Sequence, residues 1–139
     1  KINFIKKTIN IFNNGEMKRD FTFIDDIVQG IYKCSLKYPE VNNKFNYFEP
    51  EASISFAPHK IFNIGNSNPI NLLKFVEILE KALGFKAEKI YKPLQPGDVL
   101  ETYANTIRLQ DWINYKPSTR IEIGVEKFAD WYLKQGYKY

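Results

Sequence analysis

The chain has 139 residues, of which 44% are hydrophobic and 26% are charged, and its formal net charge at pH 7 is +4. This composition excludes a disordered chain and suits a single globular domain with a core of its own. The 20 Lys and Arg residues are spread along the chain against 16 Asp and Glu. Nucleic acid usually binds a clustered basic patch, so we expect a small anionic ligand and no nucleic acid.

The cellular compartment follows from what the sequence lacks. Cys34 is the only cysteine, which excludes an intrachain disulfide and favours a reducing environment. No apolar run approaches the length of a membrane span, and nothing at the start looks like a signal peptide. We therefore expect a cytoplasmic protein that makes no contact with a membrane.

The first part of the chain is predicted to contain two strands and a helix. Residues 9–12 form the first predicted strand, and the Asn-Asn-Gly that follows is typical of a turn. Residues 20–24 alternate enough to be a second strand. Asp25 or Asp26 then stands where a helix N-cap is expected, and apolar side chains recur at helical spacing beyond it until the chain nears a proline.

The middle of the chain is less regular. Residues 38–58 form an irregular segment that is long for a loop in a compact domain, and such segments are often functional or mobile. Residues 59–65, "HKIFNIG", are predicted to be a third strand.

The last part begins with a helix over 72–83, for which Asn71 is the expected N-cap and Gly84 the expected left-handed C-terminal residue. Residues 87–94 form a fourth predicted strand. Two further helices are predicted near 106–112 and over about 121–134, and the aromatic side chains of the second are expected in the core. Strands that alternate with helices indicate an α/β fold.

The familiar catalytic and metal-binding constellations are missing. His59 and Cys34 are the only residues of their kinds, so a zinc site with several such ligands is excluded, and we expect no metal. Neither a G-x-G-x-x-G motif nor a Walker phosphate loop occurs. The adjacent Asp25 and Asp26 could act as acid and base, although a helix cap is the favoured interpretation.

Three stretches taken together carry a resemblance to a known family. "GEMKRDFTFIDDIVQGI", "IFNIGNSNPINLL" and "PLQPGDVLETYA" resemble, in order and spacing, the carboxy-terminal, substrate-binding part of the extended short-chain dehydrogenase/reductase family. Within it they look most like UDP-glucuronate 4-epimerases, which act in the synthesis of capsular and other surface polysaccharides. The ending "GVEKFADWYLKQGY" is similar to the last helix of those enzymes.

The resemblance implies that residues 1–139 form a small mixed α/β domain that binds a nucleotide sugar. It covers essentially this whole chain and about the last two fifths of a complete family member. The family's glycine-rich NAD-binding turn and its catalytic Tyr-x-x-x-Lys are both absent from this sequence. We therefore expect a fragment that lacks the Rossmann half, with NAD bound mainly by that half and no turnover by this chain alone.

The resemblance also implies the residues that hold the substrate. Arg19 is expected to reach the diphosphate of a UDP-sugar, since a guanidinium offers a fixed fork of donors to phosphate oxygens. The alternative is a surface ion pair with Asp20 or Glu16. The neighbouring Lys18 is expected to face solvent.

The sequence "QPGD" is the second expected site. Asp98 matches a family Asp that accepts hydrogen bonds from the ribose hydroxyls, and Gln95 stands near the place where the family often has an Arg. A neutral Gln95 is a weaker phosphate donor than an Arg, and the alternative is a Pro-Gly turn with no ligand. Asn63 could bind a ligand or hold the turn that follows it.

The function implied by the resemblance is that of the substrate-binding lobe of an NAD-dependent epimerase that makes UDP-galacturonate from UDP-glucuronate. One alternative is a UDP-sugar decarboxylase or dehydratase of the same family. Another is a non-catalytic module that binds a nucleotide sugar or a partner protein. The resemblance also suggests a homodimer.

Overall fold

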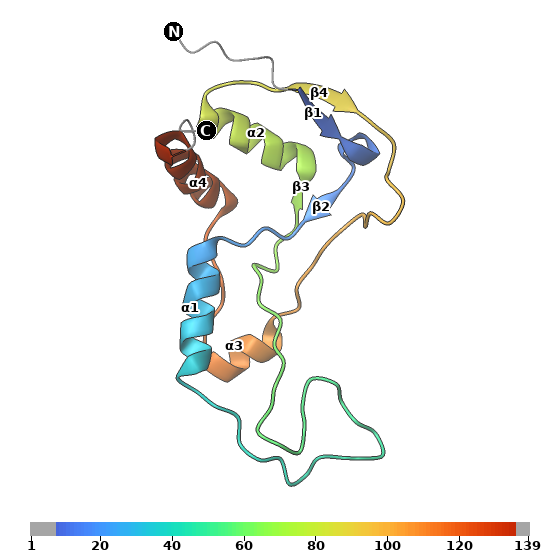
Figure 1. Cartoon of the computed structure of the whole chain (residues 1–139), viewed down its shortest axis with the longest axis vertical. Helices are drawn as coiled ribbons and strands as arrows, with labels where there is room; N and C mark the ends of the chain where they lie inside the picture. The colour runs from blue at the N-terminus through green and yellow to red at the C-terminus, as the bar shows by residue number, and fades with distance from the viewer. Residues whose placement is uncertain (1–7, 136–139) are drawn as a thin grey trace. The chain divides into compact units, whose positions relative to one another are not determined.

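The computed structural model describes residues 8–135, which divide into two compact units. Unit 1 takes the chain up to Phe21, the stretch Asn68–Tyr103, and the chain from Thr119 onward; unit 2 takes Thr22–Ser67 and Ala104–Ser118 (Figure 1). Helices and short parallel and antiparallel strand pairs together make a mixed α/β fold, as predicted. Within residues 8–135 no helix combines the length and the apolar character that a membrane span requires.

Unit 1 contains two pairs of short strands. β1 (Thr8–Ile11) pairs in parallel with β4 (Glu88–Tyr91), and β2 (Lys18–Arg19) pairs antiparallel with β3 (Ile70–Asn71). The strand predicted at 9–12 is therefore confirmed one residue earlier, and the strand predicted at 87–94 is confirmed as a shorter element. The strand predicted at 20–24 is wrong, because β2 ends at Arg19. There Phe21 stacks on Phe75, with ring centroids 4.1 Å apart, so this aromatic residue serves packing and not strand pairing.

A left-handed turn joins β1 to β2. The 3-10 helix η1 (Phe12–Gly15) has positive φ at Asn13, Asn14 and Gly15, the residues predicted to turn. Asn and Gly adopt this conformation at less cost than other residues. Met17 just beyond the turn is buried, and its backbone oxygen accepts a hydrogen bond from the backbone nitrogen of Leu72 (2.8 Å).

Two helices pack together in unit 1. α2 (Leu72–Leu83) begins at Asn71, whose side chain accepts hydrogen bonds from the backbone nitrogens of Leu73 and Lys74, and ends at the left-handed Gly84. Both predicted caps are confirmed. α2 lies against α4 (Ile121–Gln135), and the buried apolar residues of unit 1 come from these helices, β1 and the chain before β2. They are Ile11, Met17, Val76, Val125 and Ala129.

The aromatic residues of α4 are less buried than expected. Phe128 and Trp131 are 50% and 58% exposed, and their rings contact each other at 5.8 Å. The core prediction is wrong for these two, because the small residues Gly124, Val125 and Ala129 form the buried face of α4.

An ion pair joins α2 to β4. The Glu80 carboxylate lies 2.6 Å from the Lys89 ammonium and accepts a hydrogen bond from the backbone nitrogen of Ala87 (2.9 Å). The two side chains are only 12% and 23% exposed. The hydrogen bond from Lys89 lowers the pKa of Glu80 below its ordinary value of 4.5, with a further contribution from Ala87.

The lowered pKa makes the stability of unit 1 depend on pH. A carboxyl whose pKa falls on folding stabilises the fold above its unfolded pKa, and this contribution is lost as pH falls through the folded pKa. We expect Glu80→Gln to cost about 1–2 kcal/mol of unfolding free energy at pH 7, and the difference from wild type to shrink as pH falls below about 4. Urea unfolding followed by circular dichroism at pH 7, 5 and 3.5 measures this. Glu77→Gln, from an exposed pair with Lys74, is the control; an equal loss there would contradict the assignment.

Unit 2 contains α1 (Ile24–Ser35) and α3 (Ile107–Ile113). The predicted N-cap is wrong, because Phe23 occupies that position and makes no side-chain cap. Asp25 and Asp26 lie in the first turn, where their carboxylates interact favourably with the positive end of the helix dipole. Asp26 instead accepts a hydrogen bond from the backbone nitrogen of Ser118 (3.2 Å), and its backbone oxygen accepts one from the Tyr115 hydroxyl (3.0 Å). Burial and the nearby Asp26 raise the pKa of Tyr115.

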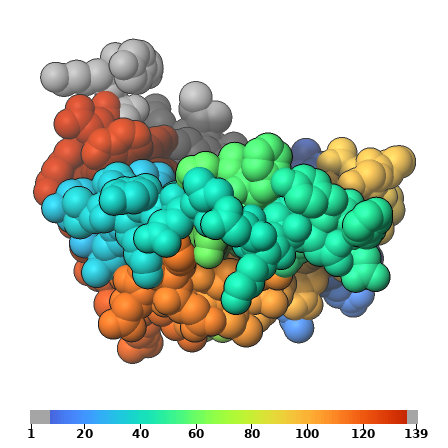
Figure 2. Space-filling model, turned by 90° about the horizontal axis from the view of Figure 1, so that it is seen from below, coloured from blue at the N-terminus to red at the C-terminus, as the bar shows by residue number. Residues whose placement is uncertain are grey.

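The segment 38–58 is irregular, as predicted. It contains turns and bends but neither a helix nor a strand, and its one ladder contact is an isolated bridge between Ile54 and Lys60. Figure 2 shows it, cyan to green, beside α3 in orange. Beyond the bridge at Lys60 the strand predicted at 59–65 is wrong, because residues 61–64 pair with no strand in the part of the chain that the structure describes.

Candidate functional site

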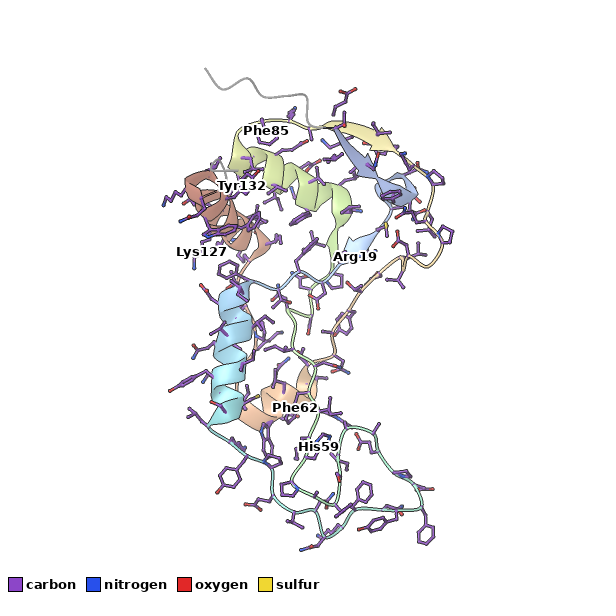
Figure 3. The ribbon with its side chains drawn as sticks, viewed as in Figure 1. Arg19, His59, Phe62, Phe85, Lys127 and Tyr132 are labelled. Atoms are coloured by element: carbon purple, nitrogen blue, oxygen red, sulfur yellow. The ribbon has the colours of Figure 1, made fainter. Side chains whose placement is uncertain are left out.

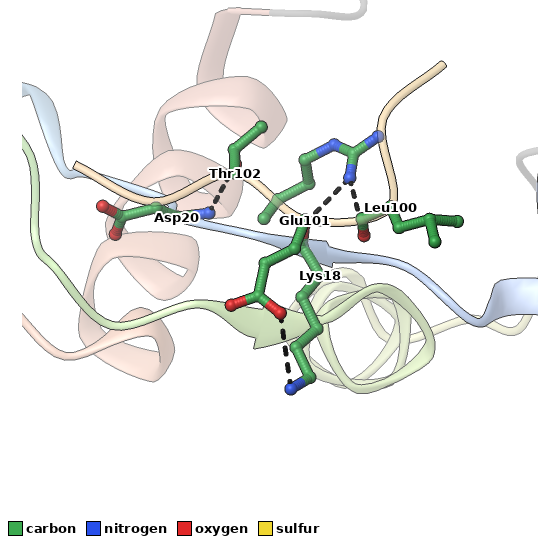
Figure 4. A network of polar contacts seen from close by, with 6 residues as sticks. Lys18, Asp20, Leu100, Glu101 and Thr102 are labelled. Carbon is green, nitrogen blue, oxygen red and sulfur yellow. Dashed lines mark hydrogen bonds and ion pairs between the residues drawn. The ribbon is translucent and has the colours of Figure 1, made fainter.

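The candidate site is built on β2, in unit 1. One side of β2 pairs with β3, where Arg19 lies opposite Ile70. On the other side the backbone nitrogen of Lys18 donates to the oxygen of Leu100 (2.9 Å), and the nitrogen of Thr102 donates to the oxygen of Lys18 (3.2 Å). These bonds surround a parallel bridge between Lys18 and Glu101, whose side chains also form the ion pair drawn in Figure 4. The motif "RDF" therefore lies beside the residues that directly follow "QPGD".

Arg19 is held at this place by the backbone of both segments. Its Nη1 donates to the oxygen of Lys18 (2.8 Å) and, at longer distance, to the oxygen of Leu100 (3.4 Å). Neither of these two contacts involves Glu16 or Asp20, the partners in the alternative interpretation. Its side chain, labelled in Figure 3, is half-buried. These contacts restrain the Arg19 guanidinium in a position from which it can bind an anion.

The two neighbours of Arg19 differ: Lys18 faces solvent, and Asp20 bonds adjacent segments of the chain. The Lys18 ammonium lies 3.6 Å from the Glu101 carboxylate, and the two side chains are 56% and 49% exposed, so Lys18 faces solvent as predicted. The backbone nitrogen of Asp20 donates to the Thr102 hydroxyl (3.0 Å), and its carboxylate accepts a hydrogen bond from the nitrogen of Asn68 (3.2 Å). These two bonds fix the chain directly after Arg19.

The sequence 95–98 forms the expected turn. The backbone nitrogen of Asp98 donates to the oxygen of Gln95 (3.1 Å), and Gly97 has a φ of 88°. Pro followed by a residue with positive φ is typical of a type II turn. The Gln95 and Asp98 side chains are both exposed. Only Val99 separates Asp98 from Leu100, so the α-carbons of Asp98 and Leu100 lie within about 7 Å of each other. Leu100 is the residue whose backbone oxygen contacts Arg19.

Asn63, the fourth residue predicted to bind the substrate, belongs to unit 2. Asn63 is exposed there, and its side-chain amide donates to the backbone oxygen of Asn105 (3.4 Å). This contact is with a neighbouring segment of unit 2 and not with the turn that follows Asn63. Arg19, Gln95 and Asp98 thus lie on neighbouring segments of unit 1, whereas Asn63 belongs to unit 2.

Sequence reasoning missed two contributors to the site. Thr102 and the backbone oxygen of Leu100 contact β2 across more than 80 residues of chain. No local pattern around either residue indicates such a contact. As for metals, no cluster of three or more His, Cys, Asp or Glu side chains occurs in the range 8–135.

Comparison with known proteins then decides the family. No family model matches the chain. It is 47% identical over 128 residues to the protein CapI of Staphylococcus aureus, covering 92% of this chain and 38% of the relative. It is 38% identical over 133 residues to a probable UDP-glucuronate 4-epimerase of Rhizobium meliloti, covering 95% and 39%. The chain is homologous to the carboxy-terminal part of UDP-glucuronate 4-epimerases. It thus matches a part of the extended short-chain dehydrogenase/reductases, as its motifs indicate.

Solved structures agree with this family. The UDP-glucuronic acid 4-epimerase of Bacillus cereus, in complex with UDP-glucuronic acid and NAD, has a TM-score of 0.71 and 26% identity, covering 95% of this chain and 37% of that one. A UDP-glucose 4-epimerase of Bifidobacterium longum has a TM-score of 0.73 at 18% identity and supports the fold alone. The chain thus spans less than two fifths of the length of each of these relatives.

Proposed function

We propose that this chain is the nucleotide-sugar-binding lobe of an NAD-dependent enzyme that converts UDP-glucuronate into UDP-galacturonate for surface polysaccharide. The observation that carries the proposal is the alignment of β2 with residues 100–102, which sets Arg19 beside Leu100, two residues after the turn at 95–98. The two motifs are far apart in sequence and meet on one unit. Homology to UDP-glucuronate 4-epimerases supports the choice of substrate.

Arg19 is proposed to bind the diphosphate. Its contacts with backbone oxygens use Nη1, so the edge formed by Nε and Nη2 carries no contact from the residues that the structure describes. That edge can make two parallel hydrogen bonds to phosphate oxygens, which is the geometry that distinguishes Arg from Lys. The bonds to Lys18 and Leu100 reduce the conformational freedom that Arg19 must lose on binding.

The turn at 95–98 is proposed to bind the rest of the nucleotide. The exposed Asp98 carboxylate can accept hydrogen bonds from two ribose hydroxyls, and Gln95 can donate one neutral hydrogen bond to a phosphate oxygen. Asn63 remains a predicted ligand residue. Binding energy from the UDP part would hold the sugar near the reacting centre while the sugar ring itself stays free to rotate.

NAD is proposed to bind elsewhere in the complete enzyme. The sequence has no glycine-rich phosphate loop, so the residues present here do not fit the dinucleotide. When bound in the parent enzyme, NAD would accept and return the hydride at carbon 4 of the sugar. This chain would bind the UDP part of the substrate and orient the sugar. The amino-terminal partner, a homodimer and a cytoplasmic location are predictions that accompany this proposal.

Calorimetric titration with UDP, UDP-glucuronate and free glucuronate tests the proposal. We expect the first two to bind with similar affinity and free glucuronate to give no heat, because the proposed ligand residues bind the diphosphate and the ribose. Formation of UDP-galacturonate by the complete enzyme separates an epimerase from a decarboxylase, a dehydratase or a non-catalytic module. Failure of both the chain and the complete enzyme to bind UDP would refute the proposal.

A further inference from the structure

The irregular segment 38–58 forms one wall of a cavity in unit 2. The cavity has a volume of about 670 Å³, which lies within the range of sites for small molecules. Its other walls come from the chain just after α1, from the residues that follow the segment, and from Trp112 of α3. All of these parts belong to unit 2. We call this space the Trp112 cavity.

Two ammonium groups lie over the indole ring of Trp112. The Lys37 nitrogen is 4.2 Å from the ring centroid, and the Lys60 nitrogen is 4.1 Å from it. Lys37 also donates a hydrogen bond to the backbone oxygen of Trp112 (2.7 Å). Phe62 stacks on the same indole, with centroids 5.9 Å apart. Because Trp is the aromatic side chain that attracts cations most strongly, the indole holds both lysines at this wall of the cavity.

The two positive charges are not neutralised by the protein. No carboxylate forms an ion pair with Lys37 or Lys60 in the part of the chain that the structure describes. Their nitrogens can be no further apart than the sum of the two distances to the ring centroid, so the charges repel each other. The indole attracts each ammonium without cancelling its charge. A cleft with such a wall concentrates anions.

The cavity also offers neutral hydrogen-bond donors. The Ser55 oxygen accepts a hydrogen bond from the nitrogen of Ala57 (3.2 Å), which leaves its hydroxyl proton to be donated. The side-chain oxygen of Asn42 accepts one from the nitrogen of Lys44 (3.1 Å), so its amide NH₂ can serve a ligand. His59, labelled in Figure 3, lines the cavity as well and carries a ring N–H in either protonation state.

We propose that the Trp112 cavity binds the phosphate group of a small metabolite, with Lys37 and Lys60 as its charged partners. A phosphate group has enough oxygens to accept hydrogen bonds from both ammonium groups and from the neutral donors beside them. A carboxylate has two oxygens and would leave part of this set unused. Glu40, the only carboxylate among the described lining residues, repels the ligand and limits its affinity. The inference goes beyond the proposed function and shares no residue with the nucleotide-sugar site.

A bound phosphate would join parts of unit 2 that are distant in sequence. Lys37 follows α1, whereas Lys60 follows the segment 38–58. The ion pair between Arg108 and Glu51 already ties this segment to α3. A ligand held by both lysines would fasten the end of the segment to the end of α1. Since such a ligand binds only the folded protein, it would also raise the melting temperature.

Titration with pyrophosphate, followed by tryptophan fluorescence at constant ionic strength, tests the proposal. The chain has two tryptophans, so Trp131→Phe leaves Trp112 as the only reporter. We expect a saturable change in its emission. Lys60→Gln should weaken binding by at least about tenfold, the worth of one charge-assisted hydrogen bond. Lys60 is exposed, so the variant is expected to fold, and circular dichroism checks this. Succinate, a dicarboxylate, is expected to bind more weakly than pyrophosphate.

Two further variants provide the controls. The Lys33 ammonium lies over the Tyr115 ring, 5.7 Å from its centroid, and Lys33 is not among the lining residues of the cavity. Lys33→Gln removes the same charge as Lys60→Gln and should change the affinity less than about twofold. Glu40→Gln should strengthen binding about twofold to threefold, because it removes the repelling carboxylate.

Three results would overturn the proposal. They are the absence of a saturable change, equal losses for Lys33→Gln and Lys60→Gln, and equal binding of succinate and pyrophosphate. The titration depends on no residue of the proposed nucleotide-sugar site, so its result is independent of the test of function.

Discussion

Replacing Arg19 with alanine is expected to weaken UDP binding by about tenfold to a hundredfold, the worth of one or two charge-assisted hydrogen bonds. The guanidinium is already ordered by the backbone oxygens of Lys18 and Leu100, so a bound phosphate would find its donors in place. Arg19→Lys should recover only part of the loss, because an ammonium keeps the charge but not the fork. Isothermal titration with UDP measures all three proteins.

The adjacent Lys18 provides the matched control. Its ammonium contacts Glu101 and its side chain is 56% exposed, so Lys18→Ala removes the same charge from the same strand without touching the proposed site. We expect less than a twofold change in UDP affinity. Equal losses for Lys18→Ala and Arg19→Ala, both vanishing at high salt, would indicate non-specific attraction and contradict the assignment.

Elements with a local chemical signal were predicted well. α2 begins at Asn71 because the Asn71 side chain accepts hydrogen bonds from the first free N–H groups of the helix. It ends at Gly84 because glycine adopts a positive φ without strain. Both properties belong to single residues and can be recognised without knowledge of the rest of the fold. The same holds for the Asn-Asn-Gly turn, where three successive residues have positive φ.

Strands were predicted poorly because a strand requires a partner. Residues 61–64 keep the alternation that indicated a strand, but no described segment pairs with them. In the candidate site, Arg19 and Asp98 were predicted through the family's motifs, whereas Thr102 was not, since its contact with Asp20 spans 82 residues. Such pairings depend on the assembled fold and leave no pattern near either residue.

Gly15→Ala is expected to destabilise unit 1 by about 2–5 kcal/mol. Gly15 is buried with a φ of 83°, which costs about 1–2 kcal/mol for a residue with a β-carbon. That β-carbon would also lie 2.6 Å from Cγ of Leu73 and 2.8 Å from both of its δ-carbons, and overpacking of this kind costs about 1–3 kcal/mol. Urea unfolding followed by tryptophan fluorescence and circular dichroism gives the value.

Gly84→Ala separates the two causes of this loss. Gly84 has a similar φ of 75°, but a β-carbon there would meet nothing within 4 Å, so only the conformational cost of about 1 kcal/mol remains. The second substitution Leu73→Ala should restore part of the stability lost in Gly15→Ala, because it removes the colliding atoms. Equal costs at Gly15 and Gly84 would show that Leu73 moves aside freely. A larger cost at Gly15 would mean that the packing of η1 on α2 holds the turn that leads into β2 and Arg19.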